Sequence, residues 1–67
     1  MMDRIQLIKM LSWNISVDPE IDIDKVIDKL KEFPNRPRSL ISELEETRLK
    51  GTSSVDKTEM IKKLERL

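Results

Sequence analysis

The segment DIDKVIDKLKEF, residues 22–33, decides the fold class because it carries the clearest helical pattern in the chain. At about 100° per residue, its apolar side chains fall on one stripe roughly 120° wide. Asp22 has the short acidic side chain that commonly caps the N-terminus of a helix. We therefore predict a helix over residues 23–33, and its buried stripe consists of Ile23, Val26, Ile27, Leu30 and Phe33.

The next segment, Pro34-Asn35-Arg36-Pro37, interrupts this helix. Proline lacks an amide donor and disfavours helical backbone at the residue before it. Pro37 is suited to the first turn of a following helix, which we predict over residues 37–49, and Gly51 is placed to end it. The residues of this helix that face inward are expected to be Leu40, Ile41 and Leu44.

A further helix is predicted over residues 57–66. Asp56 and Glu59 have the spacing of a capping box, and Val55 and Met60 stand at the positions of a hydrophobic staple. Val55 is out of phase with the apolar stripe of this helix, so we place it in the preceding loop. The stripe itself contains Met60, Ile61, Leu64 and Leu67.

The N-terminal helix, predicted over residues 2–14, has two apolar faces. Its broad arc comprises Met1, Ile5, Leu7, Ile8, Leu11 and Ile15. Met2, Met10 and Trp13 fall roughly opposite that arc, and methionine and tryptophan are frequent in protein contacts. Such a helix either lies inside a core or offers its second face to a partner. These three residues are therefore candidates for a protein-interaction patch, with packing against helices of the same chain as the alternative.

Together these helices predict an all-α fold, a small bundle of three to four short helices forming a single domain over residues 1–67. Neither an internal repeat nor strand-like alternation is apparent. The chain contains no cysteine and no histidine, which removes the usual zinc ligands and the Ser–His–Asp and Cys–His catalytic arrangements. We expect no cofactor, no metal, no enzymatic activity and no small-molecule substrate. The sequence lacks a membrane-spanning apolar run and a signal peptide, so a cytoplasmic or other intracellular soluble location is expected.

Acidic residues alternate along Asp18, Glu20, Asp22 and Asp24, which invites comparison with a calcium-binding loop. An EF-hand loop requires glycine at its sixth position and glutamate at its twelfth. Counted from Asp18, those positions hold Ile23 and Lys29. The favoured interpretation is a helix N-terminus enriched in carboxylates. Glu45 and Glu46 are read as part of a solvated helix face rather than a catalytic pair.

The C-terminal segment, residues 39–67, resembles the helix–extended-loop–helix family that includes SAP domains and the N-terminal module of transcription terminator Rho. Leu49 closes the first helix of that pattern, a Lys50-Gly51 loop with the aliphatic Val55 follows, and a second helix completes it. The second helix is matched by Lys57, Glu59, Met60, Ile61 and Leu64. Arg48 stands where the family usually has glycine, and the first helix is unusually acidic. Residues 1–38 have no counterpart in this pattern.

The resemblance implies DNA binding through the loop and the start of the last helix. The implied phosphate contacts are Arg48, Lys50, Thr52, Ser53, Lys57 and Lys62. Independently, Arg36 and Arg38 lie at the N-terminus of the helix predicted over residues 37–49 and suit phosphate contact, or they belong to a solvated turn. Net charge is zero, with 13 basic and 13 acidic residues, so charge alone does not indicate nucleic acid. Two functions remain open: nucleic-acid binding, and a protein-interaction or regulatory module, including self-association. Neither involves a membrane.

Overall fold

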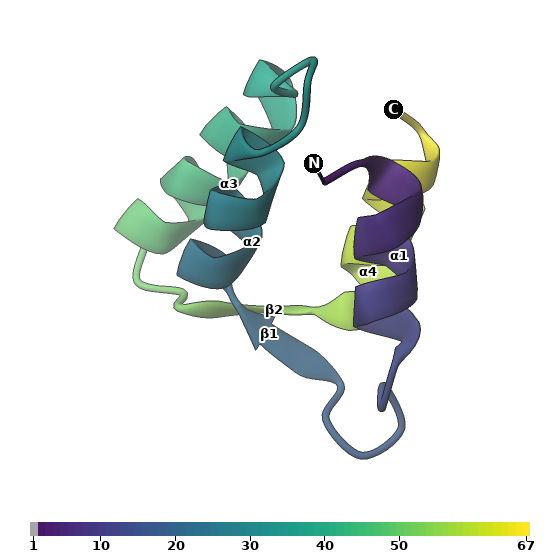
Figure 1. Cartoon of the computed structure of the whole chain (residues 1–67). Helices are drawn as coiled ribbons and strands as arrows, with labels where there is room; N and C mark the ends of the chain where they lie inside the picture. The colour runs from purple at the N-terminus through teal and green to yellow at the C-terminus, as the bar shows by residue number, and fades with distance from the viewer. Residues whose placement is uncertain (1) are drawn as a thin grey trace.

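The computed structural model describes residues 2–67, which form four helices and two short strands (Figure 1). The elements in chain order are α1 (Arg4–Ser12), β1 (Glu20–Asp22), α2 (Ile23–Lys31), α3 (Arg38–Leu49), β2 (Ser54–Asp56) and α4 (Lys57–Glu65). All four predicted helices are present, each within two residues of its expected bounds. None of the helices over residues 2–67 is both long and apolar enough to cross a membrane.

The strands β1 and β2 pair in antiparallel register, with Ile21 opposite Val55. The fold is therefore mainly helical and not strictly all-α, and the prediction that Val55 lies in an irregular loop is corrected to a strand. Three-residue strands carry too little alternation to be read from sequence. The pairing continues at both ends: the Ile23 amide donates to the Ser53 carbonyl at 2.9 Å, and the Lys57 amide donates to the Pro19 carbonyl at 2.8 Å.

The order helix–strand–helix occurs twice, in residues 4–31 and in residues 38–65. In both halves the strand leads directly into the second helix, and an aspartate stands at the N-cap position of that helix, Asp22 in α2 and Asp56 in α4. The buried residues Val26 and Leu30 of α2 correspond, 34 positions later, to Met60 and Leu64 of α4. The repeat therefore lies in the order of elements and in the spacing of a few buried residues, whereas few residues are identical between the two halves.

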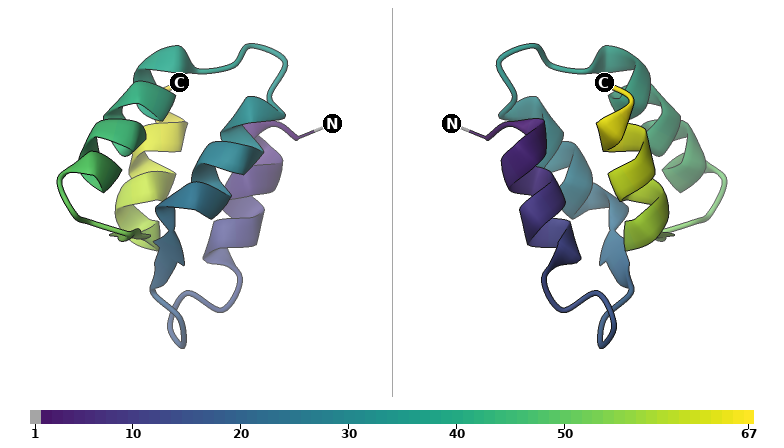
Figure 2. Two further views of the ribbon diagram at one scale, coloured as in Figure 1. Left: turned by 90° about the vertical axis from the view of Figure 1, so that its left-hand side faces the viewer. Right: turned by 90° about the vertical axis from the view of Figure 1, so that its right-hand side faces the viewer.

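The helices pack in two pairs, α1 against α4 and α2 against α3. The sheet closes one end of the molecule, and both chain ends and the α2–α3 linker lie at the other (Figures 1 and 2). Every residue of the stripe predicted for residues 23–33 is buried, as are Leu40, Leu44, Met60 and Leu64 from the other predicted stripes. The complete buried core is Leu7, Leu11, Ile23, Val26, Ile27, Leu30, Phe33, Leu40, Leu44, Met60 and Leu64.

The helix α1 departs from its predicted pattern. Leu7 and Leu11 are fully buried and Ile8 packs against the core, but Ile5 is 59% exposed, so the predicted inward arc is too broad. Because α1 packs mainly on α4, a narrow stripe at i, i+4 spacing is enough to hold it. Met1, which was assigned to the same arc, lies outside the described residues.

The two caps offer a stability test with an internal control. The Asp56 carboxylate accepts from the amides of Thr58, at 2.7 Å, and Glu59, at 3.4 Å, whereas the Asp22 side chain makes no capping bond. We expect Asp56→Ala to lower the free energy of unfolding by about 1 kcal/mol, within the usual range of roughly 0.5–2 kcal/mol. Asp22→Ala should lower the free energy of unfolding by a smaller amount. Urea denaturation measures both, and an equal or larger loss for Asp22→Ala would contradict the assignment.

Candidate functional site

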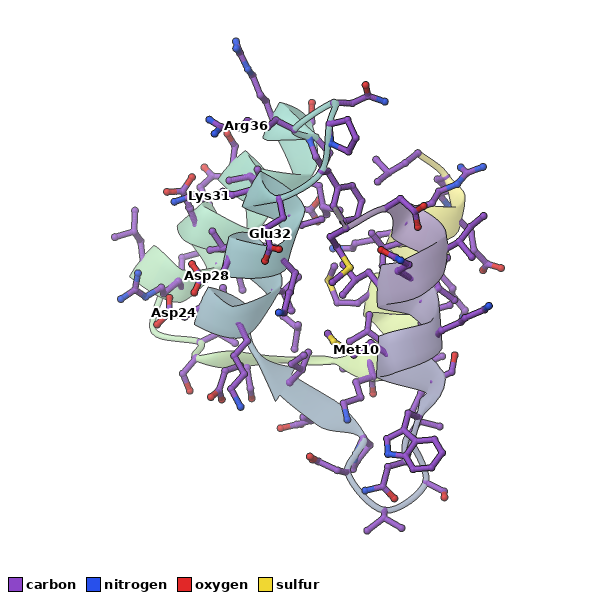
Figure 3. All side chains as sticks on the ribbon, viewed as in Figure 1. Met10, Asp24, Asp28, Lys31, Glu32 and Arg36 are labelled. Carbon is purple, nitrogen blue, oxygen red and sulfur yellow. The ribbon has the colours of Figure 1, made fainter. Side chains whose placement is uncertain are left out.

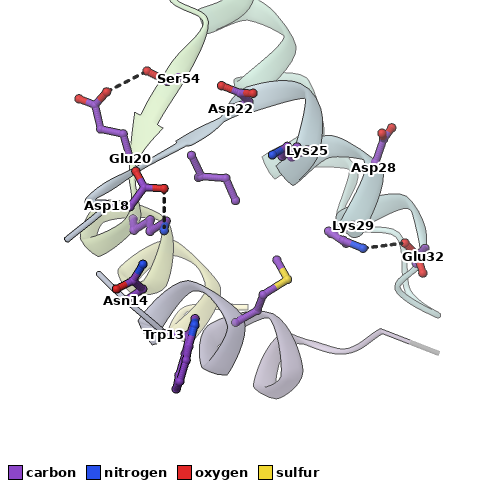
Figure 4. A pocket seen from close by; sticks show the side chains of 13 residues that line it. Trp13, Asn14, Asp18, Glu20, Asp22, Lys25, Asp28, Lys29, Glu32 and Ser54 are labelled. Carbon is purple, nitrogen blue, oxygen red and sulfur yellow. Dashed lines mark hydrogen bonds and ion pairs between the residues drawn. The ribbon is translucent and has the colours of Figure 1, made fainter. Parts of the chain in front are cut away.

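A groove of about 960 Å³ lies between α1, β1 and α2. Its wall on one side is the C-terminal end of α1, with Met10 and Trp13. The opposite wall is one face of α2, and β1 with Ile21 lies between them (Figure 4). Apolar side chains therefore occur on α1 and β1, while α2 contributes charged groups.

Trp13 lies on the rim of the groove because α1 ends there. Its extended backbone, with φ −64° and ψ 124°, terminates the helix, and its amide still donates to the Lys9 carbonyl at 3.1 Å. Asn14 then adopts a left-handed φ of 63°, and its carbonyl accepts from the amides of Val17 and Asp18. This turn leads the chain away from the core, so that the Trp13 side chain is 80% exposed.

Met10 extends the apolar surface from the rim into the groove. It is 37% exposed, and it projects from α1 toward α2 (Figure 3). Met2, the third member of the predicted interaction patch, is partly buried and packs against the core. The structure thus brings Met10 and Trp13 together at the groove, whereas Met2 lies partly buried against the core.

The α2 wall alternates in charge along Lys25, Asp28, Lys29 and Glu32, which share one helix face at i, i+3 and i, i+4 spacing. Lys29 and Glu32 form an ion pair with an N···O distance of 3.9 Å. None of these four residues was singled out from the sequence. The sequence does show that α2 has a polar face opposite its buried stripe. That face becomes the wall of a groove only because β1 lies between α2 and α1.

Lys57 closes the floor of the groove and is not displayed on the surface. The residue is 8% exposed, its Nζ lies 3.8 Å from an Asp18 carboxylate oxygen, and its amide is bonded to Pro19. Together these contacts attach the loop before β1 to the start of α4. Lys57 thus holds two segments of the fold together, and the phosphate contact expected of it would have to break this arrangement.

The amides at the start of α4 also have partners within the chain. Lys57 donates to Pro19, while Thr58 and Glu59 donate to the Asp56 carboxylate. An anion binds a helix N-terminus through free amides. The first turn of α4 therefore presents a capping carboxylate to a ligand, and β1 lies alongside it with Glu20, whose carboxylate accepts from the Ser54 hydroxyl at 3.1 Å.

The other candidate phosphate contacts are exposed but spread over the surface. Arg48 pairs with Asp24 at 3.2 Å, and Lys62 lies 4.0 Å from Glu59. Arg38 begins α3 and Lys50 follows its end, so the length of a twelve-residue helix, roughly 18 Å, separates them. The exposed loop residues Thr52 and Ser53 stand beside Lys50, and Arg36 stands in the linker near Arg38.

Among residues 2–67, no group of three or more histidine, cysteine, aspartate or glutamate side chains is arranged to hold a metal ion. Asp18 and Glu20 of the acidic ladder are instead engaged with Lys57 and Ser54, and Asp24 with Arg48. The groove can offer apolar contact and ion pairing at its walls, which suits the binding of another molecule. Comparison of the chain with protein-family models, with curated proteins and with solved structures finds no match.

Proposed function

We propose that this protein is a non-catalytic protein-interaction module whose docking surface is the α1–β1–α2 groove, with Trp13 at its mouth. The observation that carries the proposal is the 80% exposure of Trp13 beside the partly exposed Met10 at this groove. Tryptophan is enriched among residues that dominate binding energy at interfaces, and methionine adapts to varied partners.

The small size of the domain strengthens this proposal. A chain of 67 residues buries only about 60% of its unfolded surface, so each apolar side chain left outside the core is a lost contribution to stability. The chain has a single tryptophan, and that residue contributes little to the core. Because Trp13 and Met10 adjoin the same groove, their exposure is better explained by a partner than by chance scatter over the surface.

Nucleic-acid binding, as implied by the resemblance to SAP-like modules, is the second candidate. What supports it is the exposure of Lys50 together with Thr52 and Ser53 in the loop after α3. What weighs against it is the capped N-terminus of α4 and the internal pairing of Lys57 and Arg48. Acidic groups of β1 and of the start of α2 would also repel a phosphate backbone near that loop.

Selection from a library of short random peptides displayed on phage tests the docking proposal. We expect the wild-type protein to enrich peptides that no longer bind Trp13→Ala, with an affinity loss of at least about tenfold for a central aromatic contact. Leu49→Ala is the matched control, because Leu49 is 87% exposed at the far end of α3 and does not line the groove. Peptides that bind Trp13→Ala and wild type equally would contradict the proposal.

Titration with short duplex DNA at low salt tests the second candidate. If the protein binds DNA through the loop after α3, Lys50→Glu should weaken binding and reduce its salt dependence. Lys57→Glu is a poor choice for this test, because it would introduce a carboxylate beside Asp18 at a buried position and destabilise the fold. DNA binding that is lost in Lys50→Glu but retained in Trp13→Ala would favour the nucleic-acid function over the groove.

A further inference from the structure

We infer that the groove takes a cationic segment of its partner, with apolar side chains against Met10, Trp13 and Ile21 and lysine or arginine side chains against the surrounding carboxylates. This inference rests on the proposed docking function and specifies its partner chemistry. It follows from the balance of charge around the groove, from the pairing of those charges, and from the way the second half of the repeat differs from the first.

The groove has an excess of negative charge. Five carboxylates and three lysines line it, and two of the lysines are already paired, Lys29 with Glu32 and Lys57 with Asp18. The remaining lining charges are Glu20, Asp22, Asp28 and Lys25. Asp22 and Asp28 are exposed and make no hydrogen bond or ion pair through their side chains within residues 2–67. They are therefore free to pair with cations of a partner.

Trp13 adds a second preference for positive charge. The indole ring attracts a guanidinium or ammonium group placed over its face. An arginine that stacks on an exposed tryptophan also covers apolar surface with its methylene groups. An acidic partner would meet unpaired carboxylates instead, and juxtaposed like charges disfavour a complex.

The repeat shows that the apolar pair Met10 and Trp13 is specific to the first half of the chain. When Leu7 and Leu11 are matched with Leu40 and Leu44, Met10 corresponds to Glu43. When Val26 and Leu30 of α2 are matched with Met60 and Leu64 of α4, Lys29 corresponds to Lys63. In the second half Glu43 and Lys63 form an ion pair that joins α3 to α4. In the first half the corresponding pair is Met10 and Lys29, which cannot form an ion pair. Both residues line the groove between α1 and α2.

The same matching assigns Glu46 to the position of Trp13. The second half thus carries two acidic residues where the first half carries methionine and tryptophan. Both halves have the same order of elements, and the second half has it without an apolar pair at these positions. A partner that uses apolar contact at the groove accounts for the difference.

The peptide selection described above also tests this inference through the composition of the enriched peptides. Peptides that depend on Trp13 should combine apolar residues with lysine or arginine. The double variant Asp22→Asn and Asp28→Asn should bind such a peptide about fivefold to tenfold more weakly at low salt, and added salt should reduce the difference. Glu45→Gln with Glu46→Gln is the matched control, since both lie exposed on α3 away from the groove.

Calorimetry with one synthetic peptide, and with its analogue in which glutamine replaces each lysine and arginine, completes the experiment. Neutral or acidic peptides that still require Trp13, or equal affinity for wild type and the Asp22/Asp28 variant, would overturn the cationic partner while leaving the docking function intact. Failure to enrich any peptide that requires Trp13 would instead overturn the docking function. Circular dichroism of each variant confirms that lost binding does not reflect unfolding.

Discussion

Leu30→Ala is expected to lower the free energy of unfolding by about 2–5 kcal/mol, because the change removes a fully buried side chain and leaves a cavity. At roughly 0.05–0.15 kcal/mol per residue, the whole domain has only about 3–10 kcal/mol of stability. The change should therefore remove at least about a fifth of the total stability, and at the lower end of that range it would unfold the domain. Its melting temperature should fall by more than about 10 °C, as measured by circular dichroism.

Leu64→Ala is the informative companion to this variant. Leu64 occupies the position in α4 that Leu30 occupies in α2, and both are fully buried. The repeat therefore leads us to expect losses of similar size, whereas Leu49→Ala should change stability by less than about 0.5 kcal/mol because Leu49 is exposed. A Leu30→Ala protein that unfolds at nearly the wild-type temperature would contradict the assignment of the core.

The helices could be predicted from the sequence because their signals are local. The stripe from Ile23 to Phe33 and the cap at Asp56 depend only on residues within a few positions of each other. The sheet could not be predicted in this way. Ile21 and Val55 pair across 34 residues of chain, and neither three-residue segment has the length at which alternation becomes visible.

The groove was foreseen only in part for the same reason. The second apolar face of α1 was visible, and Trp13 and Met10 are exposed there, but Met2 on the same predicted face packs inward. The position of β1 between α1 and α2 is what makes Asp22, Lys25 and Asp28 lining residues of the groove. Lys57 shows the converse: its sequence context suggests an exposed loop cation, and the pairing of β1 with β2 buries it.

The halves of the repeat should not fold separately, because the core lies between them. α1 packs on α4, α2 packs on α3, and β1 pairs with β2, so each of these contacts joins residues 2–33 to residues 38–67. A half on its own retains helices of nine to twelve residues, which are marginal in water without tertiary packing. We expect peptides covering residues 1–34 and 35–67 to show little helix alone and to regain it when mixed.

The mixed pair should form in preference to a pair of identical halves. Residues 1–33 carry five basic and seven acidic side chains, and residues 34–67 carry eight basic and six acidic, so the halves have opposite net charges of −2 and +2. Opposite net charges favour association of the two different halves, and like charges disfavour pairing of identical halves. Added salt should reduce the difference in stability between the mixed pair and the identical pairs. When the mixing ratio is varied at constant total peptide concentration, circular dichroism should show maximal helicity at equal amounts of the two peptides. The melting temperature of the mixture should rise with total peptide concentration. If either peptide alone unfolds cooperatively as a helical species at every concentration, its half has a core of its own, and the arrangement inferred from the paired contacts is wrong.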